Sequence, residues 1–99
     1  MQTSDQLRAA RALIRWDQKI LAQRSGVSVP TIKRLEAQSG ILSANVPTLA
    51  AVRRALESEG VIFVAENGEG AGVRLRKHSI QSAPPYNDLV VELDQISGE

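Results

Sequence analysis

Few residues of this chain have the type and spacing that catalysis or metal binding requires. Asp88, Glu92 and Asp94 could act as paired acid–base carboxylates, but no histidine, lysine or nucleophile clusters with them. His78 is the single histidine and the chain has no cysteine, so we predict no metal site. We therefore expect a protein that is not an enzyme, with no catalytic residues, no metal and no cofactor.

The distribution of charge points to a different chemistry. The net charge is only +1, but residues 1–60 carry nine Lys or Arg and five Asp or Glu. Residues 61–99 carry three basic and six acidic side chains, and all four charged residues of 78–99 are acids. A basic N-terminal part followed by an acidic C-terminal part is typical of proteins that bind nucleic acid.

Helical signals dominate residues 1–60. Leu7, Ala10 and Ile14 form an apolar stripe at helical period, and Arg8, Arg11 and Arg15 are expected on a different face. Predicted N-caps are Thr3, which has the spacing of a capping box with Gln6, and Asp17, Ser28 and Asn45. We predict four helices: one from Thr3, one over Gln18–Arg24, one from Ser28 that stops at Ser39-Gly40, and one from Asn45 that ends at Gly60. Trp16 is expected to pack between helices.

Residues 18–38 combine two of these helices with a particular apolar spacing. Ala22 lies four residues before Gly26, and Ile32 lies six residues after it. A small residue at 22 lets two helices cross closely, and a glycine makes the tight turn between them. This spacing predicts two helices that are held rigidly against each other.

The pattern changes to that of strands after Gly60. Two predicted strands, 61–66 and 72–77, flank the turn signal Asn67-Gly68. The glycines at 68, 70 and 72 are similar in composition to a phosphate-binding loop, but a strand follows them rather than a helix, which favours a hairpin turn. Residues 78–86 are predicted to be an extended linker, and Leu89–Leu93 a short strand or docking segment.

Three stretches, LRAARALIRWDQ, ILAQRSGVSVPTIKRLEAQSG and TLAAVRRALESEGV, resemble the Cro/phage-repressor (xenobiotic-response-element, XRE) family of helix-turn-helix regulators. The resemblance covers residues 4–61, and GVIFVAENGEGAGVRLRK is similar to the hairpin tail of a bacterial subgroup. It implies a mainly α, lambda-repressor-like bundle of four to five short helices, followed by a C-terminal β-hairpin and an extended tail. The expected divisions are a DNA-binding domain at 1–60, a dimerisation hairpin at 61–77 and an acidic tail at 78–99.

The resemblance also implies which residues contact double-stranded DNA. Gln18 would bind a phosphate with its side chain and the nearby helix amides, and the helix after Ser28 would read bases. Val29 and Pro30 stand where the family often has Gln, Arg or Ser, so they could only pack on thymine methyls. The implied contacts are Gln18, Ser28, Val29, Pro30, Thr31, Lys33 and Arg34.

The resulting hypothesis is a cytoplasmic transcriptional regulator, a repressor that binds a palindromic operator as a homodimer. Strand 61–66 is apolar at nearly every position, so a second copy is expected to cover its side chains and those opposite them, namely Ile62, Phe63, Val64, Val73 and Leu75. No apolar run approaches the length of a membrane span.

Two alternatives remain open at the level of sequence. One is the antitoxin or control protein of a two-gene module, which binds its own promoter and uses its tail to bind a partner protein. The other is a protein-interaction module that has lost DNA binding. The apolar pair Val29-Pro30 and the absence of Lys and Arg from loop 37–46 favour this last alternative.

Overall fold

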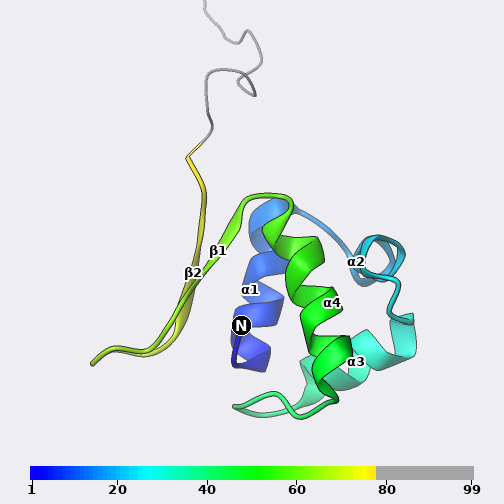
Figure 1. Cartoon of the computed structure of the whole chain (residues 1–99), viewed down its shortest axis with the longest axis horizontal. Helices are drawn as coiled ribbons and strands as arrows, with labels where there is room; N and C mark the ends of the chain where they lie inside the picture. The colour runs from blue at the N-terminus through cyan, green and yellow to red at the C-terminus, as the bar shows by residue number, and fades with distance from the viewer. Residues whose placement is uncertain (78–99) are drawn as a thin grey trace, which may run out of the picture.

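The computed structural model describes residues 1–77, so the predictions for the linker and for Leu89–Leu93 lie outside the described residues. Within residues 1–77 the chain forms four α-helices and one antiparallel two-stranded sheet (Figure 1). The elements are α1 (Ser4–Ile14), α2 (Gln18–Ser25), α3 (Val29–Ala37), α4 (Val46–Glu57), β1 (Val61–Val64) and β2 (Gly72–Leu75). The predicted mainly α chain with a hairpin after its last helix is confirmed at this level.

Each helix begins at the residue that the sequence predicts. The Thr3 hydroxyl accepts a hydrogen bond from the amide of Gln6, and the Gln6 side chain accepts one from the amide of Thr3, which completes a capping box. The side chains of Asp17, Ser28 and Asn45 each accept from the amide three residues further on. These side chains satisfy backbone donors that a helix cannot satisfy itself, so the local sequence fixes where each helix starts.

The helix and strand ends differ slightly from the prediction. Helix α3 ends at Ala37, before Ser39-Gly40, and α4 ends at Glu57 rather than at Gly60. Gly60 has a left-handed φ of 96° and redirects the chain into β1, so it belongs to the turn after the helix. The strands are two residues shorter than predicted at their C-terminal ends, finishing at residues 64 and 75.

The core lies between the helices and extends under the hairpin. Trp16 is partly buried against it, with the Arg24 guanidinium 5.2 Å from the ring centroid, in agreement with the predicted packing between helices. The buried apolar residues come from all four helices, the loop after α3 and β1: Leu7, Ala10, Leu21, Ile32, Leu35, Leu42, Val52, Ala55, Leu56 and Val61. Because Val61 is 1% exposed, the hairpin shares the core of residues 1–60.

The hairpin packs on α1 with one of its two faces (Figure 1). In the register that pairs Val61 with Leu75 and Phe63 with Val73, these four side chains share one face, where Phe63 and Val73 contact the core. Phe63 and Val73 are therefore partly buried by their own chain, and their contact with a second copy stays a prediction. Ile62 and Val64 lie on the opposite face.

A buried glutamine attaches the hairpin to α1. The Gln6 side chain is 3% exposed, and its amide nitrogen donates to the carbonyl oxygens of Val64 at 3.3 Å and Gly72 at 2.8 Å. Its amide oxygen accepts from the backbone nitrogens of Gln2 and Thr3. One side chain therefore connects the start of α1 to both strands.

Candidate nucleic-acid interface

Helices α2 and α3 are joined by a tight turn that the sequence explains. Gly26 has a φ of 78°, and its amide donates to the carbonyl of Ala22 at 2.9 Å, which closes the end of α2. Ser28 then caps α3 only two residues later, and Pro30 lies in the first turn of α3. The two helices contact each other, while α3 also contacts α1 and α2 contacts α4. The pair is thus held on the rest of the bundle from both sides.

Helix α3 has an outer face that the other described residues, within 1–77, leave uncovered. Four exposed residues follow the spacing i, i+3, i+4 and i+7, namely Pro30, Lys33, Arg34 and Ala37. We call this set the outer face of α3. Within residues 1–77, neither Lys33 nor Arg34 has a salt bridge or a side-chain hydrogen bond. Ala37 was not predicted, although its place seven residues after Pro30 could have identified it.

The residues at the start of α3 that the sequence predicts to contact DNA are only partly exposed or are already hydrogen-bonded. The Ser28 hydroxyl accepts from the amide of Thr31 at 3.3 Å and donates to the Thr31 hydroxyl at 3.0 Å. Val29 and Thr31 are half-buried, whereas Ser28 and Pro30 are exposed. Of the apolar pair Val29-Pro30, proline therefore presents more of its surface.

Gln18 lies in a cluster that the sequence did not predict. The Arg11 guanidinium donates to both carboxylate oxygens of Glu36, from Nε at 2.6 Å and from Nη2 at 2.7 Å. The Gln18 amide nitrogen donates to the same carboxylate at 3.0 Å, and Arg11 also donates to the carbonyl of Trp16 at 2.9 Å. We call Arg11, Gln18 and Glu36 the Glu36 cluster; it joins α1, α2 and α3.

The cluster changes the titration of its carboxylate. Burial by itself would raise the pKa of Glu36, but the hydrogen bonds from Arg11 and Gln18 and the positive charge of Arg11 together hold the pKa below its ordinary value. The hydrogen bond to Glu36 likewise raises the pKa of Arg11. Both side chains are therefore charged at neutral pH, and the pair is bidentate, the strongest geometry for an arginine and a carboxylate.

The three arginines that the sequence places on one face of α1 make different contacts. Arg11 pairs with Glu36, and Arg8 donates to the Asp5 carboxylate and to the carbonyl of Glu36. Arg15, which ends α1 in a left-handed conformation, is exposed and has no salt bridge to any residue of 1–77. The three arginines therefore do not act as one surface.

Salt bridges within residues 1–60 neutralise some of the basic side chains and leave others without an acidic partner in this range. Arg24 pairs with Glu59 at 3.7 Å and Arg53 with Glu57 at 2.9 Å, in addition to the pairs that Arg8 and Arg11 of α1 form. The basic side chains without an acidic partner in this range are Arg15, Lys19, Lys33, Arg34 and Arg54. Four of these five belong to α3 or flank the start of α2, where the sequence predicts contact with phosphates and bases.

Among residues 1–77, no three His, Asp or Glu side chains form a group that could hold a metal ion. In the same part of the chain, no helix has the length and apolarity needed to cross a membrane. Models of known protein families give no match to this sequence, and a search of curated proteins gives none either.

Proposed function

We propose that this protein is a transcriptional regulator that binds operator DNA through a helix-turn-helix formed by α2 and α3. The outer face of α3 is the observation that carries the proposal. Two cations without acidic partners in residues 1–77 stand on one face of a helix whose other face is buried. A helix of this kind fits the major groove of B-DNA, which is roughly 12 Å wide and presents acceptors to Lys and Arg.

The Glu36 cluster supports this proposal by giving α3 a fixed orientation. Base readout needs side chains that reach base edges from a rigid mount, because each hydrogen bond tolerates little displacement. Glu36 is tied to α1 by Arg11 and to α2 by Gln18, and Ile32 and Leu35 are 0% exposed beneath the helix. Lys33 and Arg34 would then read base edges or phosphates, while Pro30 would pack on thymine methyls.

Gln18 has a double role in this proposal. A glutamine amide carries two hydrogens, and the Glu36 carboxylate accepts one of them. The second hydrogen and the backbone amides at the start of α2 would bind a phosphate, as the sequence predicts. The exposed neighbours Lys19 and Arg15 would add charge at the same helix end.

The proposal is tested by DNA retardation with a pool of random duplexes and then with the selected sites. We expect Lys33→Ala and Arg34→Ala each to weaken specific binding by about 1–3 kcal/mol if the residue contacts a base edge. Arg54→Ala is the matched control, because it removes from α4 an exposed arginine that has no salt bridge within residues 1–77. Equal losses for all three variants, or no retardation at low salt, would contradict the assignment of α3.

The salt dependence of binding provides an independent measurement. Each phosphate that the protein neutralises contributes about −0.9 to the slope of log K against log salt. A variant that loses one phosphate contact should make this slope less steep by about 0.9. Arg54→Ala should leave the slope unchanged. A flat salt response of the unmodified protein would exclude DNA binding by this basic surface.

We further propose that the regulator acts as a repressor that binds a palindromic operator as a two-fold dimer. One reading helix covers only a few base pairs, so two half-sites about one helical turn apart are needed for useful specificity. Ile62 and Val64 are half-buried but do not pack against the core, so their face of the hairpin is the surface that we propose for a second copy.

Sedimentation of the full chain and of Ile62→Glu tests this dimer. Ile62 lies opposite Arg74, so the new carboxylate would face a guanidinium across the strands and the hairpin should remain folded. We expect a dimer for the unmodified chain and a monomer for the variant. A monomeric unmodified chain at micromolar concentration, or an unchanged dimer in the variant, would show that the hairpin is not the interface.

A further inference from the structure

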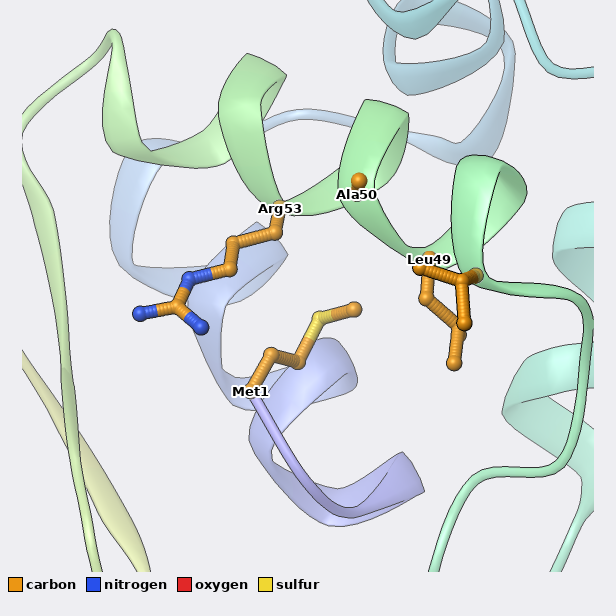
Figure 2. A pocket seen from close by; sticks show the side chains of 5 residues that line it. Met1, Leu49, Ala50 and Arg53 are labelled. Carbon is orange, nitrogen blue, oxygen red and sulfur yellow. The ribbon is translucent and has the colours of Figure 1, made fainter.

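A shallow apolar groove lies between the N-terminal residue and α4, away from the outer face of α3. Its lining is formed by Met1, Val46, Leu49, Ala50 and Arg53. Figure 2 shows the Met1 side chain below α4, between Leu49 and Arg53. Four of the five lining residues are apolar, so the groove offers an aliphatic surface with one positive charge at its end.

The size of the groove limits what can occupy it. Its open volume is about 220 Å³, below the roughly 300–1,000 Å³ of sites that hold small organic ligands. Val46 at its rim is 76% exposed, so the groove is open to solvent on this side. A few aliphatic side chains of a peptide fit this space better than a cofactor does.

The charge at the groove favours an acidic occupant. Arg53 pairs with Glu57 at 2.9 Å, but both side chains are about half exposed, at 52% and 40%. An ion pair so open to water contributes little, so the guanidinium can bind a second carboxylate at small cost.

One segment of the chain outside the described residues matches both properties. Residues 89–93 read Leu-Val-Val-Glu-Leu, and Asp88 and Asp94 flank them. The segment thus has four aliphatic side chains for the groove and acids for Arg53. None of the residues from 78 to 99 is basic apart from the lone histidine, so no cation of the tail opposes the contact.

The segment can also reach the groove. The amide of Arg76 donates to the carbonyl of Gly60 at 2.7 Å, so the chain leaves β2 beside the C-terminal end of α4. Helix α4 has 12 residues and is therefore roughly 18 Å long, with the groove along its first eight residues. The 11 residues from 78 to 88 can span up to about 36 Å when extended.

We propose that residues 89–93 dock into this groove of their own chain, with an aliphatic side chain beside Val46 and Leu49 and a carboxylate on Arg53. The docked tail covers the most exposed apolar part of α4. If the tail also binds a partner protein, that partner and the groove would compete for the same segment. The proposal does not depend on DNA binding, since the groove residues are not on α3.

Paramagnetic relaxation in the full chain tests the docking. The protein has no cysteine, so Gln95→Cys provides a single site for a nitroxide label two residues after the segment. We expect the backbone amide signals of Val46 and of residues 48–53 to lose most of their intensity, and those of β2 and α3 to keep theirs. Intensity that is lost nowhere, or equally over all of residues 1–77, would overturn the proposal.

Charge-matched variants locate the contact. Val46→Glu places a carboxylate in the groove, and an acid in the first turn is favourable for a helix, so α4 should remain folded. Pro47→Glu adds the same charge at the next, exposed position, which does not line the groove. We expect the relaxation effect to disappear in Val46→Glu and to persist in Pro47→Glu. Equal behaviour of the two variants would overturn the assignment of the groove.

Two further measurements complete the test. Val91→Asp alters the segment and leaves residues 1–77 unchanged, so its expected loss of the relaxation effect cannot come from unfolding of the groove. Mixing isotope-labelled chains with separate spin-labelled chains detects docking between molecules. Signal loss in the mixture would show that the occupant is the tail of a second copy and would overturn docking within one chain.

Discussion

The two faces of α3 use charge in opposite ways. On the inner face, Glu36 is 6% exposed in its side chain and is held by Arg11 and Gln18. On the outer face, Lys33 and Arg34 are exposed and have no partner in residues 1–77. Our proposal therefore gives different roles to ionic residues only two and three positions apart: Glu36 positions the helix, and Lys33 and Arg34 contact DNA.

Removal of the inner carboxylate should have the largest effect. Glu36→Ala leaves the Arg11 guanidinium partly buried without its counter-ion and leaves Gln18 without an acceptor. We expect the free energy of unfolding to fall by about 2–3 kcal/mol, near the lower end for a broken buried pair because Arg11 is still 20% exposed. Urea unfolding measures this change.

Glu57→Ala is the matched control for this prediction. It removes the carboxylate of the exposed pair with Arg53, and such pairs contribute at most about 1 kcal/mol. If the two variants lost equal stability, the Glu36 cluster would be no more important than a surface ion pair, and the contrast between the faces of α3 would disappear.

The same carboxylate should make stability depend on pH. A carboxylate whose pKa is lower in the folded state than in the unfolded state stabilises the fold above the unfolded value, about 4.3 for glutamate. The pKa of Glu36 is lowered, so this contribution is lost as pH falls through the lowered folded value. We expect unfolding free energy to decline with acid in this window, and the decline to be shallower in Glu36→Gln.

The sequence predicts the starts of the elements well, because these depend on neighbours along the chain. The cap at Asp17 and the turn at Gly26 involve residues three or four positions apart. Arg11 and Glu36 are 25 positions apart, and nothing in either local pattern selects one acid as the partner of one of several arginines. The sequence therefore indicates a basic surface on α1 that the fold largely neutralises.

The hairpin shows a second limit of the sequence pattern. Ile62, Phe63 and Val64 are consecutive apolar residues, so alternation does not indicate which side of the strand faces the core. Packing of the hairpin against α1 determines which side is buried, and Gln6 of α1 bonds to both strands. A chain that ends at residue 60 would not test dimerisation cleanly. It would lack Val61, which is part of the core, so its stability would change as well.

Gln18→Ala should have an intermediate effect on the stability of the fold and should also weaken DNA binding. The variant loses one hydrogen bond to a charged acceptor in the Glu36 cluster, so we expect a loss of about 1–2 kcal/mol in unfolding free energy. DNA affinity should fall evenly across sequences, because phosphate contacts carry no sequence information. A change in the preferred DNA site would indicate instead that Gln18 acts on base readout through the position of α3.

The smallest effect on stability is expected on the outer face of α3. The double variant Lys33→Ala, Arg34→Ala removes two exposed side chains that contact no acid in residues 1–77, and alanine is a favourable helix residue. We expect the free energy of unfolding to stay within about 0.5 kcal/mol of the unmodified protein. The same variant should lose its specific DNA binding. A stable protein without DNA binding would separate the two faces of α3 experimentally. A loss of stability as large as that of Glu36→Ala would mean instead that the outer cations hold the fold together.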